Sequence, residues 1–229
     1  MAPSQGVTAL IATALLLFAS HGVLSAPGIR PALIGRFGRG GFQALHATAS
    51  TATFVAFLRA YAAFDANRQL YAPLPGSGPM AVLLMPIAFF LVTARVMTPF
   101  GEAAALSPPH GIYSVTRHPG SIGLLIWAGL HLAATGDLKR VIFFATMGAI
   151  ALFAIAKNEW VLRQGNEKGH RSFLESSSLI PFMALVSRGP HSAAAGIGWP
   201  IPAAAFLAYT AMLLLHPVLF GIDPLDWLP

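Results

Sequence analysis

The feature that most constrains this chain is a series of long apolar stretches separated by short polar connections. Hydrophobic residues make up 55% of the 229-residue sequence, charged residues make up 10%, and the mean hydropathy is +0.67. An uncharged stretch of about 20 residues is long enough to cross the hydrocarbon core of a bilayer as a helix. The sequence therefore predicts an all-α, polytopic transmembrane bundle with no room for a second soluble domain.

About six such stretches fit the sequence, and we expect them to form one transmembrane domain that covers residues 1–229. The first is not preceded by a basic residue, which favours a retained helix over a cleaved signal peptide. Pro27, Pro31 and a glycine cluster from Gly38 predict a loop between the first two spans. The predicted spans lie near 6–24, 42–64, 80–97, 120–135, 141–156 and 197–219, and a polar cytoplasmic segment covers 157–178.

The distribution of basic residues predicts the orientation of the chain. By the positive-inside rule, the side with more lysine and arginine is cytoplasmic, so both termini face the periplasm of a bacterial inner membrane. The net charge of +6 then reflects orientation, and we expect no nucleic-acid partner. Ten of the fourteen basic residues share the predicted cytoplasmic side: Arg30, Arg36, Arg39, Arg95, Arg117, Lys157, Arg163, Lys168, Arg171 and Arg188.

The absence of cysteine limits the chemistry open to this chain. It excludes disulfides, thiolate metal sites, iron–sulfur ligation and cysteine nucleophiles. Any metal or haem would take its ligands from His, Met, Tyr or carboxylate side chains. An imidazole in hydrocarbon is a candidate functional group, and four histidines lie in or beside predicted spans. These candidates are His21, His46, His118 and His131.

Helix geometry places these histidines at two levels. His21, His46 and His118 lie near cytoplasmic ends of spans. His131 follows His118 by thirteen residues, or roughly 20 Å along the same helix. His21 with His46 or with His118 is therefore the simplest ligand pair. Each ring can instead donate to a backbone carbonyl at a helix end and do nothing more.

The residues around Pro119 add a candidate anion contact. Proline at the first turn of a helix holds the residues before it in a non-helical approach, so Arg117 can point along the membrane interface. A phosphate, a haem propionate or a lipid headgroup would suit its guanidinium, and an orientation anchor is the alternative. Gly123 and Gly129 lie further along this span, where small residues allow a helix or a flat ligand to approach.

Several blocks of the sequence resemble the NnrU family of bacterial membrane proteins, over nearly the whole chain. NnrU proteins are associated with denitrification, where they are linked to nitrite and nitric oxide reduction. The blocks are Ser20, His21 and Gly22 at the end of the first span, IRPALIGRFGRGGFQALHATAS from Ile29, GIYSVTRHPGSIGLLIWAGLHL from Gly111, GDLKRVIFF from Gly136, SLIPFMAL from Ser178, and LHPVLFGIDPL near the C terminus.

A relative of this family with a known activity is the plastid zeta-carotene isomerase, which binds haem b and isomerises a cis double bond of a linear carotene. The resemblance implies that His21 and His131 are axial ligands of haem b iron, with Arg117 or His118 near the propionates. His46 is a further cofactor-binding candidate. We expect membrane lipids and a lipophilic substrate or a respiratory enzyme complex as partners. Whether the chain is itself an enzyme stays open.

Two other interpretations come from different classes of protein. The Arg117, His118 and Pro119 motif also resembles membrane methyltransferases of the isoprenylcysteine carboxyl methyltransferase type, which bind S-adenosylmethionine on the cytoplasmic side. The stretch NEWVLRQGNEKGHRSFLESSSLIP, which contains Glu159, resembles their cytoplasmic tail, but Ser121 replaces the tyrosine of their motif. The third interpretation is a non-catalytic assembly partner of a respiratory reductase, which would bind neither cofactor.

Overall fold

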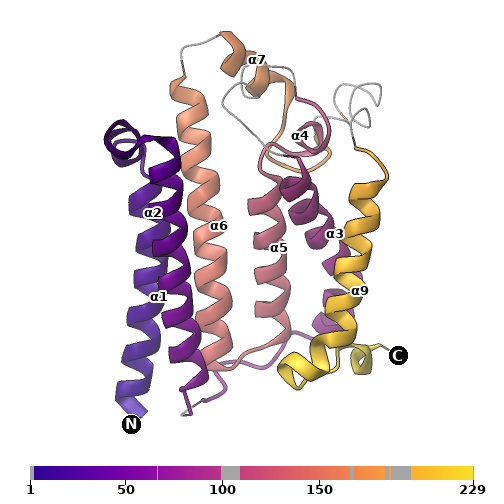
Figure 1. Ribbon diagram of the computed structural model, residues 1–229. Helices are drawn as coiled ribbons and strands as arrows, with labels where there is room; N and C mark the ends of the chain where they lie inside the picture. The colour runs from indigo at the N-terminus through magenta and orange to yellow at the C-terminus, as the bar shows by residue number, and fades with distance from the viewer. Residues whose placement is uncertain are drawn as a thin grey trace. The chain divides into compact units, whose positions relative to one another are not determined.

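The chain is helical through most of the part that the structure describes. The computed structural model describes residues 3–65, 67–98, 109–165, 168–183, 186 and 197–228. Within these residues the one pairing of extended backbone is an isolated bridge between Gln69 and Asp137. The helices are α1 (Pro3–Ser25), α2 (Ile29–Ala62), α3 (Ser77–Met97), α4 (Ile112–Val115), α5 (Pro119–Ala134), α6 (Leu138–Gln164), α7 (Lys168–Ser176), α9 (Pro200–Phe220) and the 3-10 turn η3 (Pro224–Trp227), as Figure 1 shows.

Four helices in the described ranges are long and apolar enough to cross a membrane: Gln5–Ser25 of α1, α3, α6 and α9. The helix α5 is apolar but shorter, with 16 residues. Large apolar side chains on the four helices are widely exposed, as at Leu83 (69% exposed) and Val218 (82%). Extensive exposed apolar surface is unfavourable in water and suits contact with lipid. The chain is therefore a membrane protein with at least four candidate spans.

The helix α2 differs most from the sequence prediction. A loop was predicted between residues 24 and 42. Most of that stretch is helical instead, because α2 begins at Ile29 and continues to Ala62. Gly38 bends it, with φ 71° and ψ 170°, a conformation that glycine adopts without steric penalty. Pro31 lies in the first turn, where an N–H has no helical partner to lose. The glycines and prolines thus mark a helix start and a kink.

The predicted polar segment 157–178 is also more helical than expected. The fifth predicted span ended at residue 156, whereas α6 continues to Gln164 and α7 follows from Lys168. Polar residues with good helix propensity extend a helix beyond its apolar part. This extension places Glu159 within a regular helix.

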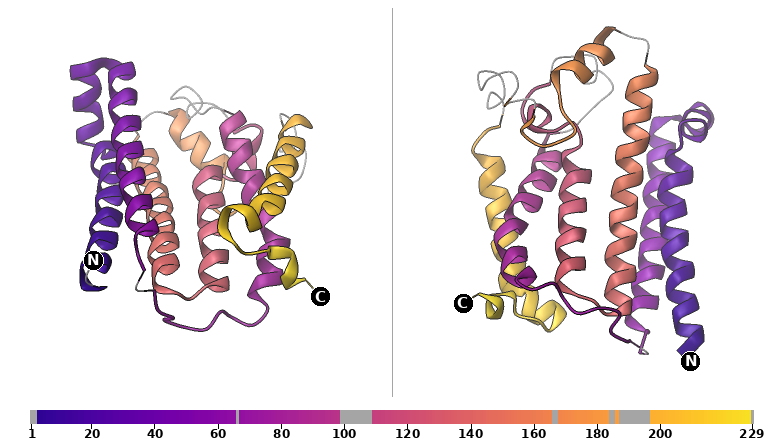
Figure 2. Two further views of the ribbon diagram at one scale, coloured as in Figure 1. Left: turned by 60° about the horizontal axis from the view of Figure 1, so that its bottom comes forward. Right: turned by 180° about the vertical axis from the view of Figure 1, so that it is seen from behind.

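One compact unit consists of Met1–Leu74 and His131–Lys157. In it, α1 and α2 lie side by side, as Figures 1 and 2 both show. Its core contains Leu10 and Leu17 of α1 and Phe57 of α2, against which partly buried residues of α6 such as Phe143 pack. The connections at one end are fixed by backbone bonds, for example Leu70 N–H to the Gly136 carbonyl at 2.7 Å.

The second compact unit consists of Pro75–Leu130 and Asn158–Pro229. The helix α3 packs against α9, and the Tyr209 hydroxyl donates to the Val82 carbonyl at 2.8 Å. A buried cluster that includes Leu91, Ile112 and Phe173 joins α3, α4 and α7. This cluster supports the segment that carries Arg117 and His118.

Candidate functional site

His21 and His46 form a pair inside the first unit. Their ring centroids are 5.6 Å apart in an edge-to-face arrangement, with His21 on α1 and His46 on α2. The kinked α2 runs back along α1 and so brings together two residues that are distant in sequence. The ring of Phe42, one turn before His46, stacks on it at 5.8 Å. Two of the four candidate histidines are thus neighbours.

The hydrogen bonds of the two rings leave ligand atoms available. His21 Nδ1 lies 3.2 Å from the Leu17 carbonyl. Because a carbonyl only accepts, Nδ1 carries the proton, and in a neutral imidazole Nε2 then holds the lone pair. His46 Nδ1 is buried and has no hydrogen-bond partner among the described residues. A histidine whose other nitrogen donates to a carbonyl has the usual arrangement of a metal ligand.

His131 is on α5 and packs against α6. Its ring stacks on Phe144 with centroids 4.3 Å apart. Phe18, one turn before His21 on α1, packs edge-on against a different residue of α6, Phe153, with ring centroids 5.7 Å apart. Phe144 and Phe153 are nine positions apart on one helix, or about 13 Å along its axis. These ring contacts of His131 and of the His21 neighbourhood therefore lie at different levels of α6. The pair implied by the family resemblance stays a prediction.

The donor set suits a haem better than a bare metal ion. No group of three or more His, Asp or Glu side chains that could hold a metal occurs among the described residues. Two imidazoles do not complete the shell of a zinc ion, which takes four ligands. They do complete the shell of haem iron, because the macrocycle supplies the other ligands. His21 and His46 are therefore the residues of this pair that could hold a haem.

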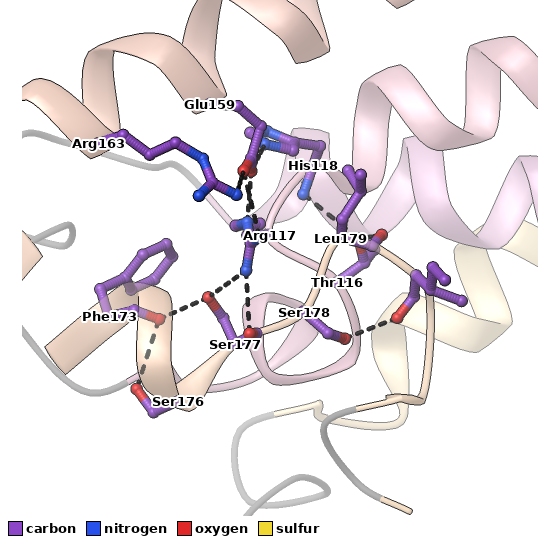
Figure 3. A network of polar contacts seen from close by, with 11 residues as sticks. Thr116, Arg117, His118, Glu159, Arg163, Phe173, Ser176, Ser177, Ser178 and Leu179 are labelled. Atoms are coloured by element: carbon purple, nitrogen blue, oxygen red, sulfur yellow. Dashed lines mark hydrogen bonds and ion pairs between the residues drawn. The ribbon is translucent and has the colours of Figure 1, made fainter. Parts of the chain in front are cut away.

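A second cluster of polar residues surrounds Glu159 in the second unit, as Figure 3 shows. Arg117 donates from Nε to Glu159 Oε1 and from Nη2 to Oε2, the latter at 3.2 Å. His118 Nε2 lies 2.8 Å from Oε1, and exposed Arg163 reaches Oε2 at 3.3 Å. Arg117 Nη1 donates to the Ser177 carbonyl at 2.9 Å. One carboxylate thus joins α6 to the residues before α5.

The backbone holds Arg117 and His118 in place from both sides. Thr116 is extended, and Pro119 begins α5, so the two residues cannot continue a helix. The Arg117 N–H donates to the Ser178 carbonyl at 3.0 Å, and the Thr116 hydroxyl donates to the Leu179 carbonyl at 2.8 Å. The segment after α7 thereby fixes the motif against the end of α6.

Burial favours the neutral form of His118 in this network. Its side chain is buried, and burial lowers its pKa below the ordinary value, although the hydrogen bond to Glu159 acts in the opposite direction. Because the carboxylate accepts, a neutral His118 carries its proton on Nε2 and donates it to Glu159. Arg117 is already bonded to Glu159 and Ser177, so its guanidinium is committed to this network.

Sequence reasoning did not rank Glu159 or Lys157 among the site residues. Glu159 is at the centre of the second cluster. Lys157 follows Phe153, which packs against Phe18 of α1, by one turn and so lies near the histidine pair. The sequence did contain a signal for both residues, because Lys157 and Glu159 are the first charged side chains after the apolar part of α6. Only packing shows what each of them faces.

The comparison with protein families decides the classification. A model of the NnrU protein family matches residues 9–224, nearly the whole chain. The chain belongs to the NnrU family. No curated protein and no solved structure matches it significantly. The candidate sites of this NnrU-family member are therefore judged from its own residues.

Proposed function

We propose that this NnrU-family chain is a multi-pass protein of the bacterial inner membrane that binds haem b through His21. It crosses the membrane six times, with α2 and α5 as the additional spans, and both termini lie in the periplasm. The observation that carries the proposal is the imidazole pair of His21 and His46. One ring has its ligand nitrogen free of the helix carbonyl, and the other has a buried nitrogen without a partner.

Bound haem would supply one-electron exchange at its iron, and axial ligation and the surroundings would tune it. The residues of the chain have separate parts in this arrangement. The Leu17 carbonyl fixes the tautomer and the rotation of the His21 ring. Phe42 covers one face of His46 and limits access of water to it. From the family resemblance we propose a role in nitrite and nitric oxide reduction, or in cis–trans isomerisation of a lipophilic polyene.

An absorption spectrum tests this proposal. Full-length protein purified in detergent from haem-replete cells should show a Soret band, and His21→Ala should abolish it. His46→Ala and His131→Ala identify the second ligand, and we expect the loss in His46→Ala. Exposed His110, substituted by Ala, is the matched control and should leave the band unchanged. Colourless wild-type protein, or an unchanged band in His21→Ala, would show that the haem proposal is wrong.

One observation favours a second function, an S-adenosylmethionine-dependent membrane methyltransferase. The structure joins the Arg117 and His118 motif to Glu159, the two stretches that resemble such enzymes. Calorimetry with S-adenosylmethionine separates the two functions. Binding by the wild type that His118→Ala abolishes and His46→Ala preserves would place the methyltransferase first. If the wild type does not bind S-adenosylmethionine, the methyltransferase function is wrong.

A further inference from the structure

A lysine without a counter-charge lies beside the histidine pair. Lys157 is half-buried on α6, at the end of the first unit. Within the described residues its ammonium has no hydrogen bond or ion pair. The charged and titratable groups that act on it or feel it are the Arg30 guanidinium and the His46 ring. Charges removed from water are normally paired, so a half-buried ammonium whose charged neighbours are cations favours an added anion.

Arg30, near the start of α2, is linked to His46 through the ring of Phe42. Its guanidinium lies over the Phe42 ring, 5.7 Å from the centroid. Phe42 in turn stacks on His46, so Arg30, Phe42 and His46 form a continuous row. Lys157 follows Phe153 of α6 by one turn, and the Phe153 ring would lie 3.6 Å from a Cβ at Gly22, the residue after His21. Arg30 and Lys157 therefore lie near the histidine pair on two different helices.

The acidic residues of this unit are too distant to neutralise the two cations. Its aspartates and glutamates are Asp65 and Asp137. Asp137 directly precedes α6 and accepts from Asn67 Nδ2 at 2.9 Å and from Arg140 Nη1 at 3.1 Å. Lys157 follows Asp137 by twenty positions, or about 30 Å of helix. Asp65 follows the other end of α2, far from Arg30 along that helix. Glu159, two positions after Lys157, is bonded to Arg117, His118 and Arg163. Among the described residues, no carboxylate is therefore paired with Arg30 or Lys157.

We propose that Arg30 and Lys157 form a binding site for an anionic oxygen group beside His21 and His46. Arginine presents a planar fork of donors and lysine a point charge, a combination that suits a phosphate or a carboxylate. Two sources supply this chemistry: the phosphate of an anionic phospholipid and a propionate of haem. The propionate source rests on the proposed haem function, and the phospholipid source does not.

The phospholipid source is tested with full-length protein in detergent and added phosphatidylglycerol or phosphatidylcholine. Native mass spectrometry measures the ratio in which the two lipids are retained. We expect a preference for phosphatidylglycerol that falls about fivefold in Lys157→Met and again in Arg30→Gln, the factor for a contribution of about 1 kcal/mol per basic residue. Lys157→Arg should keep it. Lys139→Met, at the other end of α6, is the matched control.

The propionate source is tested by titrating the same proteins with haem b and with its dimethyl ester, which lacks the two negative charges. If the propionate is the ligand, the wild type prefers haem b over the ester, and Lys157→Met loses about fivefold of that preference. Lys139→Met should behave as the wild type. Because the measurement is a ratio of affinities, a general loss of folding does not imitate the result.

The two experiments together decide the proposal. The proposal of an anion site is wrong if Lys157→Met and Arg30→Gln change neither the ratio of retained lipids nor the ratio of affinities for haem b and its ester. If the wild type binds neither haem nor ester, the proposed function fails, and the lipid ratio alone decides on the site. A change in only one ratio identifies the source.

Discussion

Glu159 is the residue on which Arg117, His118 and Arg163 converge. The side chains of Arg117 and Glu159 are 9% and 13% exposed. Removing the carboxylate leaves a buried guanidinium unpaired, and a broken buried pair costs roughly 3–5 kcal/mol. We therefore expect Glu159→Gln to lower the stability of the folded protein by about that amount, measured by thermal unfolding in detergent. Exposed Glu175, changed to Gln, should shift stability by less than about 0.5 kcal/mol.

The protonation of His118 makes stability depend on pH. Burial lowers the pKa of His118 in the folded protein, whereas in the unfolded chain it is about 6.5. Between these two values the unfolded chain binds more protons, so the stability contributed by neutral His118 is present above about pH 6.5 and is lost as the pH falls through that window. Thermal unfolding at pH 7.5 and at pH 5.5 should show a lower midpoint at the acidic value.

The variant His118→Gln separates this effect from other titrating groups. Its amide can donate to Glu159 as Nε2 does, but it does not titrate. We expect a smaller difference between the two midpoints than in the wild type. An equal difference would mean that His118 is not the residue responsible.

At the scale of the element, Gly123 and Gly129 of α5 have different roles. A Cβ at Gly123 would lie 2.8 Å from Val92 Cγ2 and 2.9 Å from the Ala88 carbonyl of α3. A Cβ at Gly129 would meet no described atom within 4 Å. Gly123→Ala should therefore destabilise the protein by roughly 1–3 kcal/mol through overpacking. Gly129→Ala should raise stability by up to about 1 kcal/mol through helix propensity. Unfolding of both variants in detergent checks this, and equal effects would contradict close packing of α3 and α5.

At the scale of the whole molecule, the number of crossings sets which connections face the periplasm. If α2 and α5 cross the membrane, the connection before α3 is periplasmic. If only the four long apolar helices cross, it is cytoplasmic. The native chain has no cysteine, so single cysteines report accessibility directly. We expect an impermeant maleimide to label Leu74→Cys in spheroplasts and to spare Arg36→Cys. Labelling of Arg36→Cys alone would reverse the orientation, and protection of both would exclude α2 as a span.

The sequence determined the membrane character of the chain and the approximate position of each apolar helix. Both follow from the hydropathy of consecutive residues, a sum that does not depend on how the helices pack. The bounds of α1, α3 and α9 lie within a few residues of the predicted spans for this reason. The loop expected before residue 42 was wrong, because proline and glycine signals are common to loops, helix starts and kinks.

Only the tertiary structure decided which side chains meet. The sequence selected His21, His46, Arg117 and His118. It did not predict that Glu159 bonds both Arg117 and His118, or that Lys157 lies near His46. These partners are 25 to 111 positions apart in the chain, as His21 is from His46 and His46 from Lys157. Contact at such separations depends on the rotation and register of each helix, and packing fixes both. Hydropathy along the chain carries no information about either.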